Sequence, residues 1–203
     1  MMHARDDWNL AKLAEQGDDD AFDRLLQRWQ RPVHRFVYRL LGHAEDAEDV
    51  AQEVFVRLYR ALQRARLRRR SGAFSTWLFQ VARHAAYDRQ RWRRRHPESP
   101  WSEGTDPGGL PADPGGTPTR HADLAELGRA IALAVGELPE AQRTALVLFE
   151  YEGMSHDEIG AIMKCSAKSV EARLYRARSR LRRRLAEWEG LSFQEGKTAR
   201  DMA

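Results

Sequence analysis

Apolar residues recur every three or four positions along most of this chain, which is the spacing of an amphipathic helix. The longest such stripe runs from Phe22 to Leu41, and another runs from Ala47 to Ala61. No segment keeps the every-second-residue alternation of a half-buried strand. The pattern therefore predicts an all-α protein.

A stretch rich in proline and glycine divides the helical pattern into two blocks. Residues 97–120 contain six prolines and five glycines in 24 positions, a composition typical of a flexible linker. We expect two small helical domains at 1–96 and 121–190, joined by this linker. A tail with little pattern follows at 191–203.

Two helices joined by a three-residue turn stand near the end of the second block. Ser155 and Glu158 have the spacing of a capping box, which predicts the start of the first helix. Ser166 is placed to cap the second helix. A short-turn pair of this kind is how a recognition helix enters the major groove of DNA.

The second of these helices is strongly basic. From Lys164 to Arg184 the chain has nine Lys or Arg and the single acid Glu171, whereas an ordinary solvated helix mixes both signs. A phosphate-bearing partner is therefore expected. The alternative is an amphipathic hairpin with a solvated basic face.

Another basic region ends the first block. Five arginines between Arg64 and Arg70 have no acid beside them, and the next helix, expected to be capped by Ser75, interleaves aromatic rings with arginines. Cations suffice for duplex DNA, whereas exposed rings add stacking surface for unpaired bases. The pattern therefore indicates that this region binds a melted DNA strand. In the alternative interpretation, Trp77 and Tyr87 are core residues and the arginines form a solubilising face.

One helix of the first block has a polar face beside its apolar one. Asp49, Gln52, Glu53 and Val56 are three and four positions apart and therefore lie together. None of them belongs to the apolar stripe, so both carboxylates are expected to be exposed. The face is either a docking surface or a solvated helix face, and it lacks the histidines that would favour a metal pair.

Composition limits the location and the chemistry. No apolar run approaches the roughly 18 residues of a membrane span, and the N-terminus lacks the features of a signal peptide, so a cytoplasmic location is expected. The lone Cys165 excludes a disulfide within the chain. No nucleophile, paired acid and base, or phosphate-binding loop is apparent, so neither an enzyme nor a cofactor is expected.

Taken together, these motifs resemble the extracytoplasmic-function (ECF) group of bacterial sigma factors, over roughly 20–95 and 124–185. Residues 46–59 are similar to the segment by which this family grips the clamp helices of RNA polymerase. Residues 74–95 are similar to its element for melting and reading the minus-10 sequence. Residues 138–181 are similar to its reader of the minus-35 sequence.

The resemblance implies three sets of contact residues. Core polymerase would be bound by Asp49, Gln52, Glu53 and Val56. The minus-10 strand would be bound by Arg66, Arg69, Arg70, Ser71, Phe74, Ser75, Trp77, His84, Tyr87, Arg91 and Arg94. The minus-35 duplex would be bound by Ser166, Lys168, Ser169, Glu171, Ala172, Arg173 and Arg176.

The implied function is transcription initiation at specific promoters, with core RNA polymerase, promoter DNA and an anti-sigma factor as partners. Lys164, His84 and Lys168 depart from the family pattern, which has glycine, asparagine and glycine there; these departures bear on promoter sequence rather than on the fold. A self-sufficient DNA-binding regulator whose first block dimerises is the main alternative, and an enzyme acting on nucleic acid is a third. A regulator of that kind would bind its site without polymerase.

Overall fold

The computed structural model describes the backbone of residues 3–64, 72–96 and 118–201, and the side chains of 6–64, 72–96 and 126–186. Within these ranges the chain forms eight helices and no strand, which confirms the all-α prediction. None of the described helices is both long and apolar enough to cross a membrane.

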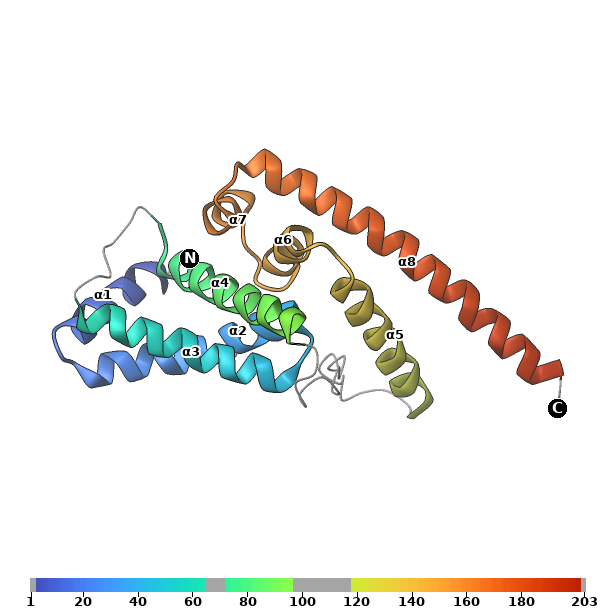
Figure 1. The fold of residues 1–203 in the computed structure, drawn as a ribbon, viewed down its shortest axis with the longest axis horizontal. Coiled ribbons are helices and arrows are strands. Elements are labelled where there is room, and N and C mark those ends of the chain that lie inside the picture. The colour runs from blue at the N-terminus through green and yellow to red at the C-terminus, as the bar shows by residue number, and fades with distance from the viewer. Residues whose placement is uncertain (1–2, 65–71, 97–117, 202–203) are drawn as a thin grey trace.

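The first block contains four helices: α1 (His3–Glu15), α2 (Asp19–Leu41), α3 (Ala44–Gln63) and α4 (Phe74–Arg95). Helix α2 contacts each of the other three (Figure 1). Aromatic rings fill the centre: Phe36 and Phe79 meet edge to face with their centroids 5.0 Å apart, and Trp29 meets Phe79 in the same way. The predicted stripes of α2 and α3 therefore face one shared core.

The second block also contains four helices: α5 (Pro118–Gly136), α6 (Glu140–Glu150), α7 (His156–Met163) and α8 (Ala167–Asp201). Helix α8 contacts the other three along its length (Figure 1). Ile159, Ile162, Val170 and Leu174 are buried between α7 and the start of α8. The apolar stripe of the recognition helix thus packs against its own block, as predicted.

Side chains cap several helix ends, and those at Ser155 and Ser166 were predicted from the sequence. The Asp18 carboxylate accepts a hydrogen bond from the Ala21 amide at 3.0 Å. Ser155 and Glu158 form both hydrogen bonds of the capping box, and the Ser169 amide donates to Ser166 Oγ at 3.2 Å. These side chains satisfy amide groups that have no partner within the helix.

Three boundaries differ from the prediction. Ser75 does not cap α4: the helix begins at Phe74, whose side chain is fully buried, and Ala73 occupies the cap position without a side-chain hydrogen bond. Helix α5 begins at Pro118, so the last three residues of the predicted linker are helical. Helix α8 continues to Asp201 through much of the predicted tail. Residues 97–117 lie outside the described residues.

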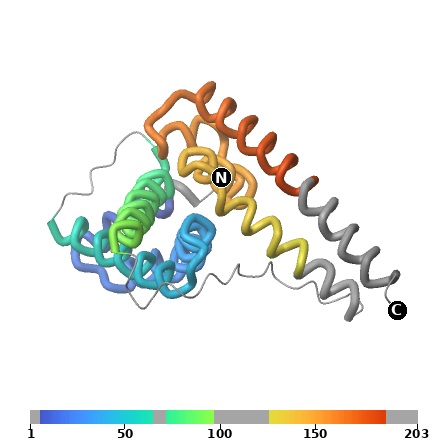
Figure 2. The backbone as a smooth tube through the Cα atoms, turned by 45° about the vertical axis from the view of Figure 1, so that its right-hand side comes forward, coloured from blue at the N-terminus to red at the C-terminus, as the bar shows by residue number. Residues whose placement is uncertain are grey.

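The two blocks also pack directly against one another. Helix α2 contacts α5 and α6, and α4 contacts α7. In Figure 2 the second block, coloured yellow to orange, lies against the first block, coloured blue to green. The sequence pattern contains no signal for this packing.

Candidate protein and nucleic-acid interfaces

The predicted polymerase-binding residues form an exposed ridge on α3. The side chains of Asp49 and Glu53 are 65% and 50% exposed, Val56 is 46% exposed, and Gln52 is also exposed. The expectation that both carboxylates lie outside the core is therefore confirmed. What the ridge binds stays a prediction.

A groove of about 850 Å³ lies between this ridge and α2. Gln52 and Val56 form one wall, and Ala51 and Phe55 contribute apolar surface. Its other lining residues are Leu26, Gln30, Arg31, His34, Arg35 and Glu48. The groove combines an apolar floor with cationic groups from α2, a combination that suits a helix with one apolar face and acidic flanks.

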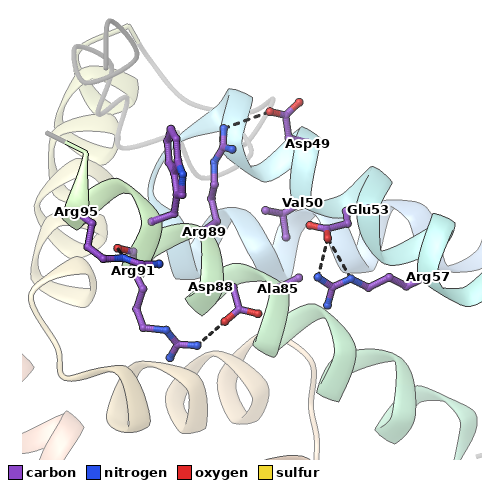
Figure 3. A pocket seen from close by; sticks show the side chains of 10 residues that line it. Asp49, Val50, Glu53, Arg57, Ala85, Asp88, Arg89, Arg91 and Arg95 are labelled. Atoms are coloured by element: carbon purple, nitrogen blue, oxygen red, sulfur yellow. Dashed lines mark hydrogen bonds and ion pairs between the residues drawn. The ribbon is translucent and has the colours of Figure 1, made fainter. Parts of the chain in front are cut away.

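A second groove, of about 380 Å³, lies on the other side of the ridge, between α3 and α4. Figure 3 shows ion pairs along it: Asp49 with Arg89 at 3.3 Å, Glu53 with Arg57 at 2.6 Å, and Asp88 with Arg91. Most of its arginines therefore already have an acid of the same block as partner. Exposed pairs of this kind contribute little to stability.

Asp46 connects α3 to α4 in a way that the sequence did not suggest. The residue is 1% exposed, and its carboxylate accepts hydrogen bonds from Arg89 Nε at 2.7 Å and Arg93 Nη1 at 2.6 Å. Two arginines satisfy the buried charge, as burial of a carboxylate requires. The pairing directs both guanidinium groups of α4 towards α3.

The described members of the minus-10 set differ widely in exposure. Arg91 and Arg94 have 58% and 64% of their side chains exposed, and His84 is exposed. Phe74 is fully buried, while Ser75 and Trp77 are half-buried, Trp77 packing on the edge of the core. Arg66, Arg69, Arg70 and Ser71 lie outside the described residues.

Tyr87 is only 4% exposed and is covered by the second block. Its hydroxyl donates to the Glu140 carbonyl oxygen at 2.6 Å and lies 2.5 Å from Thr144 Oγ1. Burial raises the pKa of this phenol above its usual value. For Tyr87 the structure therefore agrees with the core interpretation, and its predicted DNA contact is not available in this arrangement. Nearby, His84 remains exposed, but partial desolvation, followed by the charges of Arg83 and Lys164, lowers its pKa.

The minus-35 set lies on the first turns of α8, after a turn formed by Lys164, Cys165 and Ser166. Lys164 has φ of 55°, which is the left-handed conformation that favours glycine. This conformation explains why glycine is usual at this position in the family that the sequence resembles. Gly160 also enables the turn, because an added Cβ would lie 2.7 Å from the Cys165 carbonyl oxygen.

The side chains of this set are mostly accessible. Ser166, Lys168, Glu171 and Arg176 are exposed. Ser169, Ala172 and Arg173 are half-buried. Arg173 folds back onto the turn, where its Nη1 lies 3.0 Å from Cys165 Sγ and 3.8 Å from Met163 Sδ. It would have to rotate outwards to contact a base.

Tyr175 is a candidate that the sequence interpretation missed. It is 70% exposed and lies four positions after Glu171, on the same face. An aromatic residue outside the apolar stripe of Val170, Leu174 and Ala177 could have signalled it. Further along, Arg178 is paired with Glu150 at 2.8 Å and Arg184 with Glu137 at 2.9 Å, so these later arginines contact the protein's own acids.

Among the described residues, no group of three His, Cys, Asp or Glu side chains could hold a metal ion. The interfaces described above consist of exposed charge, partly exposed rings and open grooves. Such surfaces suit binding to macromolecules rather than chemistry on a small molecule.

Comparison with protein families identifies the two blocks. Residues 25–96 match sigma-70 region 2, and residues 128–181 match sigma-70 region 4. The chain belongs to the sigma-70 family of transcription initiation factors.

Its relatives include members of the ECF group. The chain is 32% identical over 182 residues to the RNA polymerase sigma-H factor of Pseudomonas aeruginosa, covering 88% of this chain and 93% of the relative. It is 33% identical over 174 residues to the ECF RNA polymerase sigma-E factor of Escherichia coli, covering 83% and 88%. It is 31% identical to the ECF sigma factor SigW of Bacillus subtilis, covering 87% and 95%. The protein is an ECF sigma factor.

A solved structure has the same fold. CnrH, in complex with the cytosolic domain of CnrY, aligns with a TM-score of 0.63 and 27% identity over 89% of this chain and 97% of CnrH. The sigma factor RpoE of Bartonella quintana, bound to the anti-sigma factor NepR, aligns with the same TM-score at 23% identity.

Proposed function

We propose that this sigma factor binds core RNA polymerase through the ridge and groove of α3, reads the minus-35 element as duplex with α8, and captures the minus-10 element as melted strand with α4. The observation that carries the proposal is the distribution of accessible chemistry. An acidic and apolar ridge lies on one block, and an exposed basic recognition helix lies on the other.

The ridge suits a basic protein surface. Asp49 and Glu53 project from α3 with half or more of their side chains exposed, and Val56 beside them adds apolar area. Acidic and basic patches steer association and fix the register of an interface. The groove next to the ridge offers further apolar surface at Phe55.

The start of α8 suits a DNA major groove. Lys168, Glu171 and Arg176 are exposed on it, and these side-chain types can reach phosphates, cytosine and guanine respectively. The N-terminal turns of a recognition helix are those that meet base edges. We assign sequence reading to these turns, and mainly affinity to the arginines beyond them.

These surfaces give each part of the chain a separate proposed role. We assign residues 1–96 to polymerase binding and the minus-10 element, residues 121–190 to the minus-35 element, and residues 97–120 to the connection between them. Phosphodiester chemistry would belong to polymerase. An anti-sigma factor is the expected regulator, since the related CnrH was solved with the cytosolic domain of CnrY.

DNA binding with and without core polymerase tests this proposal. DNA fragments from the source genome would be selected by the protein alone, by core polymerase alone and by the two together. We expect selective retention only with both, and loss of the selectivity in Lys168→Ala/Arg176→Ala. Equal selectivity of the protein alone would instead favour a self-sufficient regulator.

A further inference from the structure

We propose that Trp8 of α1 is a positioning residue for capture of the melted minus-10 strand. It fixes the segment 72–77, which leads into α4, at the place where α4 meets unpaired bases. The inference rests on the proposed function of α4, and it gives Trp8 no contact with DNA. The contacts of Trp8 within the protein are independent of what α4 binds.

Helix α1 lies outside the part of the chain that matches the family. The match to sigma-70 region 2 covers residues 25–96, whereas α1 spans His3–Glu15 and contacts α2, α3 and α4. Leu10 and Ala11 of α1 are buried in the core of the first block, and they account for the docking of the helix. Trp8 is only half-buried, and its polar atom reaches a different part of the block.

Trp8 joins α1 to the segment before α4 by two contacts. Its Nε1 donates a hydrogen bond to the Gly72 carbonyl oxygen at 2.9 Å, across 64 positions of the chain. Its ring meets the Phe74 ring edge to face, with the centroids 5.6 Å apart. An indole combines a large ring with an N–H donor. Trp8 therefore fixes both a backbone group and a buried ring of the same segment.

The start of α4 has no side-chain cap. Ala73 occupies the cap position without a side-chain hydrogen bond, and Gly72 before it has φ of 152°, a conformation that glycine adopts more readily than other residues. Local side chains therefore do little to set the direction in which the chain enters α4. The hydrogen bond from Trp8 gives this entry an anchor from another helix.

Phe74 connects Trp8 to Trp77, a candidate ring for stacking on a base. Phe74 is fully buried, and its ring centroid lies 6.2 Å from that of Trp77. Trp77 is half-buried, so part of its ring remains accessible to an unpaired base. Closely packed side chains transmit displacements to their neighbours. The position of Trp8 therefore influences the position of the Trp77 ring.

The two residues before Trp8 attach this end of α1 to α2. Arg28 of α2 forms ion pairs with Asp6 at 2.9 Å and with Asp7. Asp7 is 1% exposed; burial raises the pKa of its carboxyl group, and Arg28 opposes the shift. Two carboxylates on one guanidinium restrict the orientation of the helix. Through three consecutive residues, α1 thus connects α2 to the start of α4.

A positioning role and a purely structural role predict different effects of losing the hydrogen bond. The bond between Trp8 and Gly72 is exposed, and a neutral hydrogen bond makes only a modest net contribution to folding free energy. Its geometry is nevertheless directional. Loss of the bond should therefore alter base selection by α4 more than it alters the thermal melt.

Selection from opened promoter DNA tests the inference. The probe is a genomic fragment that core polymerase retains only with this protein, with its minus-10 segment unpaired and randomised. Trp8→Phe keeps a ring beside Phe74 and removes the donor to Gly72. With core polymerase, we expect base enrichment at the preferred minus-10 position to fall about fivefold, the factor that corresponds to one net hydrogen bond. Polymerase pull-down, minus-35 preference and the thermal melt should stay close to wild type.

Leu13→Ala is the control, because it removes apolar surface from an exposed position of the same helix and should keep the wild-type enrichment. Wild-type enrichment in Trp8→Phe, or an equal loss in Leu13→Ala, would overturn the positioning role. A uniform loss at all positions with a lower melting temperature would also overturn it, in favour of a structural role. No base preference of wild type in the unpaired segment would instead count against the proposed function.

A second variant changes the same contact from its other side. Gly72→Ala places a side chain where φ of 152° disfavours one, so the backbone must shift the Gly72 carbonyl oxygen relative to Trp8. We expect a loss of the same base enrichment. Trp8→Phe/Gly72→Ala should lose no more than the larger single loss, since both changes act on one contact. Losses that multiply in the double variant would mean that the two residues act separately and would overturn the inference.

Discussion

Helices α4 and α8 are both rich in arginine, but they use that charge differently. On α4, Arg89 and Arg93 are paired with the buried Asp46. On the first turns of α8, Lys168 and Arg176 are exposed, and no acid in the described part of the chain forms an ion pair with either. Much of the charge of α4 is therefore neutralised within the protein, whereas that of α8 is available to phosphate.

The contrast indicates two ways of meeting DNA. Cations without internal partners release counterions from duplex DNA and give affinity that falls steeply with salt. A helix whose arginines are held by internal acids depends more on its remaining exposed groups and on rings that can stack with bases. The arginine content alone would have predicted the same role for both helices.

Reversing the acidic ridge should have the largest effect. Asp49→Lys/Glu53→Lys replaces attraction to a basic clamp with repulsion, which can cost several kcal/mol across an interface. The stability of the fold should fall by no more than about 1 kcal/mol, because the ion pairs to Arg89 and Arg57 are exposed. Pull-down of core polymerase measures the loss of binding, and a thermal melt of the same variant measures the change in fold stability.

Duplex DNA binding by α8 serves as the internal control for Asp49→Lys/Glu53→Lys. The variant should keep the weak affinity of α8 for duplex DNA, since the changes lie on the other block. A variant that melts like wild type and still recruits polymerase would show that the interface lies elsewhere.

Asp46→Asn should reduce the difference between the two helices. The change removes the buried carboxylate that Arg89 and Arg93 share and should cost about 3 kcal/mol of folding free energy, as loss of one member of a buried ion pair does. Chemical denaturation measures this cost. Asp88→Asn, at the exposed partner of Arg91, is the matched control, and an equal loss in both would mean that burial of Asp46 is not what matters.

Arg173→Ala should change base preference at one position of the minus-35 element. A bidentate contact from arginine to guanine contributes about 1 to 3 kcal/mol of discrimination. Selection from a promoter library measures it. Arg182→Ala, further along α8, should weaken binding uniformly. If Arg173→Ala has only that uniform effect, the contacts of Arg173 with Cys165 and Met163 reflect a structural role.

Lys164→Gly should have the smallest effect. It removes the cost of about 1 kcal/mol of a left-handed non-glycine residue, but part of this gain is offset by the greater freedom of glycine in the unfolded chain. A net stabilisation of about 0.5 kcal/mol is expected in a thermal melt. Lys164→Ala keeps the strained backbone and should give no gain; an equal gain would point to the charge rather than the backbone.

Local features of the fold could be predicted from the sequence because they depend on near neighbours. The cap at Asp18, the capping box of Ser155 and Glu158, and the cap at Ser166 all involve groups three residues apart. The apolar stripes likewise specify which face of each helix is buried.

Features that depend on distant residues could not be predicted. In the sequence, Asp46 is an ordinary acid in the first turn of a helix. Its partner Arg89 is 43 positions later in the chain, so the buried ion pair could not be predicted. Tyr87 reads as an exposed ring because its cover comes from α6, 53 positions away at Glu140. Residues 191–203 have little pattern in the sequence, yet α8 continues through Gly190 to Asp201, since glycine within a helix costs only about 1 kcal/mol.

We propose above that this protein directs polymerase to promoters with two separate elements. The most direct test is to map RNA 5′ ends made by core polymerase on genomic DNA with and without the protein. We predict new 5′ ends that share one motif about 10 and another about 35 base pairs upstream, and their loss with Lys168→Ala/Arg176→Ala. An unchanged set of 5′ ends, from protein that is folded and binds polymerase, would contradict it.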